Sequence, residues 1–314
     1  GGMRILYRWN RNGYICTPAE SGYRKSSECI KRIPGQQWKK GKRQKPGSWR
    51  SGRYVGYACD ETAQLMPMPI VLAHRITREL SACRRSGYIK DIFSDGKAQV
   101  TVEYEEGKPV RLESVVVSCQ HGAEKSLKKL DAEIREKVLR SALRLLPPDE
   151  DTKILINPSG KFVCGGFDAD TGLTGRKLMV DTYGSMVPHG GGAFSGKDCS
   201  KVDRSAAYMA RYIAKNIVAA GFASKCQVSL AYAIGVAEPV MIEVDTFGTG
   251  KVCADDCLAA AIPLVFGVTP VQIMESLRLN RPIFRQTAVF GHFGRKEFPW
   301  ERTDKVLDLQ DAIL

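Results

Sequence analysis

Apolar residues recur at helical spacing in both halves of the chain. Residues 69–87, PIVLAHRITRELSACRRSG, predict an amphipathic helix that ends at Gly87. Residues 123–148, AEKSLKKLDAEIREKVLRSALRLLPP, predict a long helix with a charged face that two prolines stop. Residues 202–221 predict a helix with an apolar face. Thr269 and Pro270 begin another, as N-cap and first helical residue.

Apolar and polar residues alternate in other segments, as in β-strands. Residues 97–118, KAQVTVEYEEGKPVRLESVVVS, alternate on both sides of EEGK and predict a β-hairpin. Residues 176–184 and 227–248 are also strand-like. The order of elements predicts an α+β fold of two similar domains, each a mixed or antiparallel sheet with helices on one face. We place the division near Gly165 and Gly166, which gives domains over residues 56–166 and 167–314.

Residues 1–55 show no period of either kind. They hold 14 Lys and Arg but only two acids, a net charge of +12, and the tract KKGKRQKPGSWRSGR is typical of a disordered basic segment. The whole chain has 47 basic and 34 acidic residues, so residues 56–314 hold the remaining 33 and 32, a net charge of +1. Only the N-terminal segment therefore favours a nucleic-acid partner, and for the rest such a partner is not expected.

Composition indicates the cellular compartment and the role of the cysteines. The sequence has no apolar run of the roughly 18 residues that span a membrane, and its first twenty residues do not form a secretory signal. We expect a cytoplasmic protein without a membrane partner. The ten cysteines are scattered, and the four histidines stand far apart. This favours reduced, mostly structural thiols over a zinc site.

Residues 189–208, HGGGAFSGKDCSKVDRSAAY, raise the question of phosphate binding. Gly191 to Lys197 fits most of a P-loop, a Gly followed by four residues and Gly-Lys. A P-loop needs Ser or Thr after the Lys, whereas Asp198 stands there. The glycines of a P-loop also join a strand directly to a helix, whereas the strand-like residues 176–184 end several positions before these glycines. The P-loop interpretation is therefore rejected. A plain Gly-rich turn remains an alternative to an anion site.

Neighbouring charges favour the anion site. Four cations lie within one short part of the chain beside glycine-rich backbone, namely Arg176, Lys177, Lys197 and Lys201. Glycines allow backbone N–H groups to approach an anion closely, and the cations neutralise it. Asp203, at the start of the predicted helix, is a candidate magnesium ligand on phosphate oxygens. It is equally explained as an acidic residue at a helix start.

Several segments together resemble the S-adenosylmethionine synthetase (methionine adenosyltransferase) family. The resemblance covers residues 56–314 and is most specific in two motifs, GLTGRK at 172–177 and HGGGAFSGKD at 189–198. Other matching segments are GYACDETAQLMPMPIVLAHR, DGKAQVTVEYEEGKPV, INPSGKFVCGG, KVDRSAAYMARYIAKNIVAAG, YAIGVAEPV and GHFGRKEFPWE. On this resemblance, residues 56–166 are the central domain and 167–314 the C-terminal domain.

The resemblance implies an activity. In this family the sulfur of L-methionine attacks C5′ of ATP, the whole triphosphate leaves, and the enzyme hydrolyses it to phosphate and pyrophosphate. Mg²⁺ (or another divalent cation) and K⁺ are used. The family also implies a homodimer or homotetramer with active sites between subunits. Such a reaction requires positioned cations more than a general base.

The resemblance also assigns residues to roles. Arg176, Lys177, Lys197 and Lys97 would bind the phosphates and act in catalysis, and Asp203 would bind the metal. Asp170 would serve ATP and methionine, and Lys201 methionine. Phe162 would stack on adenine. The remaining ATP contacts would be Asp95, Gly96, Lys161 and Ala193. Lys161 departs from the Arg common in the family, which loses the guanidinium fork. Without the resemblance, Lys97 is a hairpin-edge lysine and Phe162 a core residue.

Residues 1–55 do not resemble the family. A family chain starts with a segment containing Glu-Gly-His-Pro-Asp-Lys, which these residues lack, and Arg50 stands where the family has an acid. We expect this stretch to be disordered, or to be an out-of-frame or misassembled replacement of the usual start, which we prefer to a basic arm. The alternative function is then a catalytically impaired homologue that acts as a binding subunit.

Overall fold

The computed structural model describes residue 48 and residues 51–170 and 175–313. Arg50 and most of the basic segment lie outside this range. The first described strand, β1 (Gly52–Cys59), already includes the last four residues of the segment that the sequence sets apart as 1–55. A bridge between Ser48 and Ile234 precedes it.

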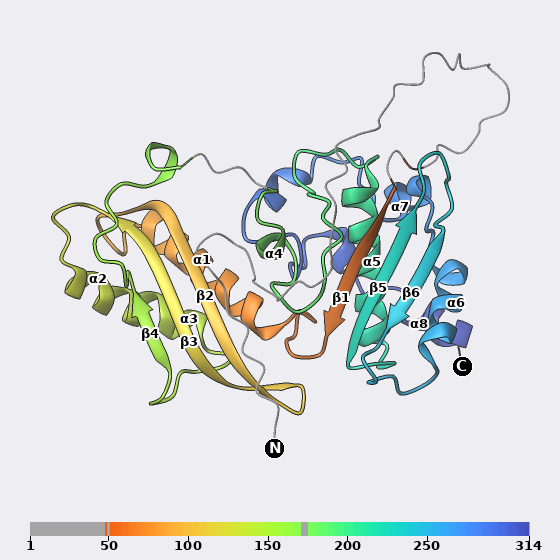
Figure 1. Ribbon diagram of the computed structural model, residues 1–314, viewed down its shortest axis with the longest axis horizontal. Helices are drawn as coiled ribbons and strands as arrows, with labels where there is room; N and C mark the ends of the chain where they lie inside the picture. The colour runs from red at the N-terminus through yellow and green to blue at the C-terminus, as the bar shows by residue number, and fades with distance from the viewer. Residues whose placement is uncertain (1–47, 49–50, 171–174, 314) are drawn as a thin grey trace, which may run out of the picture.

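One sheet has the strand order β2-β3-β4. Strands β2 (Ile92–Glu105) and β3 (Lys108–His121) form the predicted hairpin, and β4 (Lys153–Ile156) pairs in parallel with β3. Helices α1 (Met68–Arg85), α2 (Leu127–Ile134) and α3 (Arg140–Ala142) lie behind this sheet in Figure 1. A π-helical turn, Arg135–Leu139, joins α2 to α3, so the predicted long helix is present with one irregular turn.

A second sheet has the order β1-β5-β6 and is antiparallel throughout. It combines β1 with β5 (Lys225–Tyr232) and β6 (Met241–Asp245), which lie largely within the strand-like residues 227–248. Strand β1 therefore precedes the first sheet in sequence but belongs to the second (Figure 1). The division near Gly165 and Gly166 lies between β4 and α4 (Leu178–Asp181), and it remains a prediction.

Helix α5 (Val202–Ala219) is the centre of the second core, and every residue from Val202 to Val218 is buried. It packs against β1 and β5 on one side, and against α7 (Pro270–Ser276) and α8 (Val306–Ile313) elsewhere. Gly56 permits the close approach of β1, because a Cβ there would lie 2.0 Å from the carbonyl carbon of Ala210. A separate core joins α1, β2, β3 and the π-helical turn. These two helix-backed sheets confirm the predicted α+β fold of repeated domains.

Two further predictions have definite outcomes. Thr269 caps α7 through a capping box with Gln272, as its Thr-Pro sequence indicates. Residues 176–184 were predicted as a strand, and this is wrong, because Leu178–Asp181 form the short helix α4. Three apolar residues in a row fit either element, since no full period is sampled.

In the described residues, the remaining helical segments are one α-helix and three 3₁₀ turns. They are α6 (Asp255–Val265), two 3₁₀ turns at Phe284–Ala288 and Pro299–Glu301, and a 3₁₀ turn earlier in the chain at Gly166–Asp168. In the part of the chain that the structure describes, no single helix is long and apolar enough to cross a bilayer. Helices α6 and α7 meet that test only as a pair, across a bend of 75°.

Candidate phosphate-binding site

The Gly-rich loop of residues 189–201 connects the region of α4 to the start of α5. Gly191 and Gly196 have φ angles of 85° and 84°, in the left-handed region that glycine adopts without strain. The N–H of Gly191 donates to Nδ1 of His189 over 2.8 Å. Burial lowers the pKa of His189, although Asp203 opposes this. The loop is therefore a defined turn structure that brings its polar groups near the first turn of α5.

Lys197 and Asp203 form an ion pair within this region. The Lys197 Nζ atom lies 3.2 Å from Asp203 Oδ2, and Asp203 is only 5% exposed. Gly192 closes the other side of the carboxylate, because a Cβ there would stand 2.3 Å from Asp203 Oδ1. The cation expected to bind phosphate and the carboxylate expected to bind the metal are thus direct neighbours.

The turn that carries Arg176 and Lys177 lies against the same loop. A Cβ on Gly175 would be 3.5 Å from both Ala193 Cβ and the Ser195 carbonyl oxygen. The Arg176 and Lys177 residues are exposed. The structure therefore brings together the GRK end of one motif and the AFSGK end of the other, which are separated in sequence.

Asp181 ties this turn to α4, and the sequence interpretation missed it. Burial raises the pKa of the Asp181 carboxyl to about 6, and the N–H of Gly175, which donates to it, opposes the rise. Its Oδ2 atom is buried and has no hydrogen-bond partner among the described residues. An Asp inside the apolar run LMVDTY was the available sequence signal, since buried carboxylates are uncommon.

A buried histidine supports the loop from below. His292 is fully buried, with Nδ1 2.7 Å from the Tyr208 hydroxyl oxygen and Nε2 3.4 Å from Ser195 Oγ. Burial first, and then the nearby Arg204 and Arg295, lower the pKa of His292 to about 3. The imidazole is therefore neutral near pH 7 and holds Ser195 in place by packing and hydrogen bonding.

Arg204 fixes the backbone at the end of the loop. Its Nη1 donates to the Lys197 carbonyl oxygen over 2.8 Å, and its guanidinium lies 4.1 Å from the centre of the Phe284 ring. Lys201, by contrast, faces Asp198, with 3.3 Å between Nζ and Oδ2. Lys197 and Lys201 therefore have different acidic neighbours.

A second group of expected ligands lies on the other sheet. Lys97 is exposed on β2 opposite Ser118. Asp95 Oδ2 accepts from the Gly166 N–H over 3.0 Å, and the N–H of Asp170 donates to the Gly166 carbonyl. Asp95 and Asp170 therefore both bond to Gly166, in the connection that follows β4, and Gly96 is the chain neighbour of Asp95.

Lys161 and Phe162 stand near this second group. Phe162 pairs with His121 through backbone and ring contacts, and Lys161 Nζ donates to the Ala123 carbonyl over 2.8 Å. Phe162 is only partly buried, so it is not a closed core residue. The sequence-expected ligands thus form two groups, and the contacts described for them do not join the groups directly.

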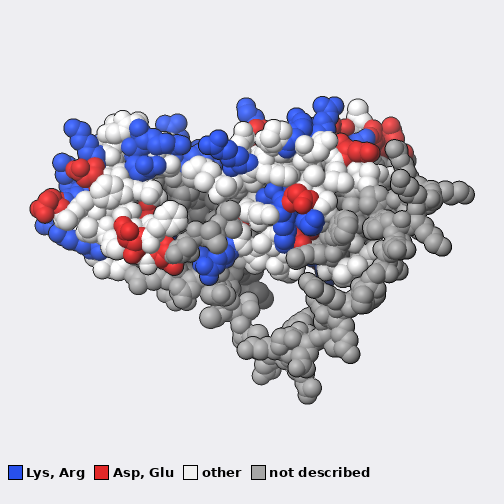
Figure 2. All heavy atoms as spheres, turned by 90° about the horizontal axis from the view of Figure 1, so that it is seen from above, with Lys and Arg blue, Asp and Glu red and all other residues white. Residues whose placement is uncertain are grey.

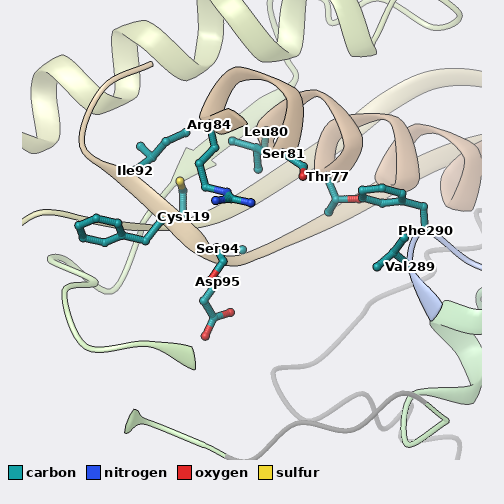
Figure 3. A pocket seen from close by; sticks show the side chains of 12 residues that line it. Thr77, Leu80, Ser81, Arg84, Ile92, Ser94, Asp95, Cys119, Val289 and Phe290 are labelled. Atoms are coloured by element: carbon teal, nitrogen blue, oxygen red, sulfur yellow. The ribbon is translucent and has the colours of Figure 1, made fainter. Parts of the chain in front are cut away.

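A cavity of about 290 Å³ adjoins Asp95 and Gly96. Figure 3 shows that α1 contributes Arg84 and Thr77, β2 contributes Ser94 and Asp95, and Val289 and Phe290 approach from the C-terminal part. It therefore lies where the two halves of the chain meet.

In the face shown in Figure 2, Lys and Arg side chains lie along one edge, with acidic side chains near both ends.

Asp203 is the candidate metal ligand of this site. Within residue 48 and residues 51–170 and 175–313, no group of three or more His, Cys, Asp or Glu side chains is arranged to hold a metal ion. Mg²⁺ commonly takes one or two carboxylates and completes its shell with substrate phosphates. The buried Asp203 carboxylate fits that role, provided that phosphate oxygens supply other ligands.

Two sheets, each backed by helices, make this chain an α+β protein of two similar domains. Comparison with family models specifies the class. Residues 47–162 match the central domain of S-adenosylmethionine synthetase, and residues 164–302 match its C-terminal domain. The chain belongs to the S-adenosylmethionine synthetase family.

Proposed function

We propose that this chain is a methionine adenosyltransferase, forming S-adenosylmethionine from ATP and L-methionine. Family membership supports the class of reaction. The observation that carries the proposal is the contact of the Gly175 turn with Ala193 and Ser195. This contact brings the turn that carries Arg176 and Lys177 to the loop that carries Lys197, which supports a shared role for the three cations in binding a triphosphate.

The triphosphate is both the handle of ATP and the leaving group. When methionine sulfur attacks C5′, negative charge develops on the leaving oxygen, and positioned cations stabilise it. We assign this role to Arg176, Lys177 and Lys197, with Lys97 as a further phosphate contact. The same cations would hold tripolyphosphate for its hydrolysis to phosphate and pyrophosphate.

Asp203 would hold Mg²⁺ against phosphate oxygens, and the bound ion would neutralise charge there. Asp203 pairs with Lys197, and this pair keeps Lys197 close to the position that phosphate would occupy. The use of K⁺ rests on the family resemblance alone. Asp170 and Lys201 are proposed for methionine, and Asp95, Gly96, Lys161, Phe162 and Ala193 for the nucleotide.

Self-association is part of the proposal. Lys97 lies on the first sheet and Lys197 on the loop packed against the second. Two copies arranged as a homodimer, or as a homotetramer of dimers, would complete each site from both chains. Light scattering at micromolar concentration should give at least the mass of a dimer, and a stable monomer would contradict this part.

A catalytically impaired homologue that acts as a binding subunit is the second candidate. The sequence contains no Glu-Gly-His-Pro-Asp-Lys stretch, which in the family serves phosphate and magnesium. On this alternative the chain would bind ATP or tripolyphosphate without turnover.

The decisive experiment is an assay of the purified chain with ATP, L-methionine, Mg²⁺ and K⁺. Formation of S-adenosylmethionine and phosphate, both dependent on methionine, would support the transferase. Tripolyphosphate binding without product would support the binding subunit. If the chain formed no product and bound no tripolyphosphate, both candidates would be contradicted.

A further inference from the structure

A pair of cysteines lies at the start of α6, remote in sequence from the Gly-rich motifs. Cys253 immediately precedes Ala254, the N-cap residue, and Cys257 lies in the first turn of the helix. The Cys257 N–H donates to the Ala254 carbonyl over 3.0 Å, which closes the turn between them. The two cysteine side chains are close enough for each to influence the ionisation of the other. Cys257 is exposed and Cys253 is half-buried.

The backbone around the pair is held in place. Asp255 accepts two hydrogen bonds from Thr246, one from the N–H over 3.1 Å and one from Oγ1 over 2.6 Å. Helix α6 also packs against β6, at the outer side of the second sheet in Figure 1. A disulfide needs sulfur atoms about 2.05 Å apart. Because the two cysteines lie on one closed turn and their side chains are neighbours, small movements of the two side chains complete the approach.

We propose that Cys253 and Cys257 are a site of reversible oxidation and form an intramolecular disulfide. The oxidant is a low-molecular-weight disulfide of the glutathione class. The two thiols lose two protons and two electrons as the S–S bond forms. The small disulfide accepts the electrons, its S–S bond breaks, and two small thiols leave.

The surroundings of the two sulfurs set the order of the steps. Burial, the interaction with the neighbouring Cys257 thiol and the charge of Asp255 raise the pKa of Cys253 to about 11. Cys257 is the more exposed thiol and therefore attacks the small disulfide first. Once Cys257 is part of a mixed disulfide, it no longer raises the pKa of Cys253. Cys253 then attacks the Cys257 sulfur, and the second small thiol leaves.

The other described cysteines differ in access or in pairing. Cys59 and Cys226 lie on the adjacent strands β1 and β5, but both are fully buried. Burial raises the pKa of each thiol well above its ordinary value. Cys164 is exposed and lies after β4, away from α6. It therefore serves as an internal control for simple mixed-disulfide formation.

The test is peptide mapping of the full chain after equilibration in a glutathione redox buffer. Trypsin leaves Cys253 and Cys257 together in residues 252–278. We expect this peptide to lose two hydrogens without gaining glutathione, and dithiothreitol to restore them. Because the second thiol is already in place, the intramolecular disulfide should exceed the mixed disulfide at Cys164 about tenfold. In Cys253→Ser, glutathione should remain attached to Cys257.

The same measurement can overturn the proposal. If residues 252–278 carry glutathione as readily as Cys164 and do not lose hydrogens, the pair is not a disulfide site. Cross-linking of this peptide to another cysteine peptide would also contradict it. Because every readout is a peptide mass, the result does not depend on transferase activity.

Discussion

Arg211 and Glu301 form a two-point ion pair inside the second core. Arg211 Nε lies 3.0 Å from Glu301 Oε1, and Nη2 lies 2.8 Å from Oε2, with both side chains fully buried. Lys215 Nζ also lies 2.8 Å from Oε2. Helix α5 is thereby fastened to the 3₁₀ turn at Pro299–Glu301, and one carboxylate balances two buried cations.

Replacing Glu301 with Gln should destabilise the fold strongly. Two buried cations would lose their counter-charge, and breaking a buried pair commonly costs about 3–5 kcal/mol. Urea unfolding would measure the loss. Glu297→Gln is the matched control, because Glu297 is 48% exposed in its pair with Arg295 and should cost less than about 1 kcal/mol. Equal effects of the two variants would contradict the assigned importance of the buried pair.

Glu301 should also make stability depend on pH. Burial alone would raise its pKa, but the charges and hydrogen bonds of Arg211 and Lys215 lower it below the ordinary value. The pair therefore stabilises the fold above the carboxyl pKa of the unfolded chain, and this contribution is lost as the pH falls through the folded value.

His292 should give a separate loss of stability in mild acid. Its folded pKa of about 3 is below the unfolded value of about 6.5. Between these values the unfolded chain binds a proton that the folded chain excludes. The free energy of unfolding should therefore fall by up to about 1.4 kcal/mol per pH unit below pH 6.5.

The variant His292→Gln isolates this contribution. Gln keeps a polar side chain but does not titrate, so the slope below pH 6.5 should become shallower by about one proton. The slope is the informative quantity, because the variant is also expected to be less stable at pH 8. A slope identical to that of the parent would show that His292 does not remain neutral when folded.

Lys197→Ala and Arg176→Ala should each weaken tripolyphosphate binding. A charge-assisted hydrogen bond contributes about 1.5–3 kcal/mol, which corresponds to a tenfold to hundredfold loss of affinity. Calorimetric titration measures it. Arg176 is exposed, so its removal leaves the core intact, whereas Lys197→Ala also removes the ion pair of Lys197 with Asp203. Lys153→Ala, 73% exposed on β4, is the control. Unchanged affinity in both test variants would rule out the proposed cation cluster.

Gly192→Ala should disturb the same site through shape alone. The added Cβ would lie 2.3 Å from Asp203 Oδ1, so the carboxylate or the loop must move. Overpacking of this kind costs about 1–3 kcal/mol, and we expect tripolyphosphate affinity to fall about tenfold. Gly122→Ala is the control, because its nearest neighbour would be Asp91 Cβ at an ordinary 3.6 Å. Full affinity in Gly192→Ala would show that Asp203 can move without consequence.

The sequence predicted the longer elements well. The apolar face of residues 202–221 predicted α5, and Gly221, with a φ of 78°, follows its end. The hairpin β2–β3 was equally clear, because each arm samples the strand period many times. Residues 176–184 failed because an apolar run of three residues samples neither period.

The candidate site could be predicted only in part. Motif residues such as Lys197 and Asp203 were identified, but not their ion pair, which depends on how the loop folds over α5. The contact of Ser195 with His292 spans 97 positions along the chain. Local pattern contains no information on such a distance, so the support beneath the loop required the structure.

Strand β1 precedes the first sheet in sequence but pairs in the second, and this has a consequence for synthesis on the ribosome. Gly52 lies opposite Tyr232 and Cys59 opposite Lys225, so β1 emerges long before β5, its partner among the described strands, exists. The hairpin β2–β3 and its helices can form meanwhile from contiguous chain. Until β5 appears, the nascent protein must carry an unpaired strand with an apolar face, Tyr54, Tyr57 and Cys59 among its buried residues. Such a strand is open to edge pairing with other chains. Recovery of folded protein should therefore depend on the rate of elongation through residues 60–232 and on chaperones that bind exposed strands.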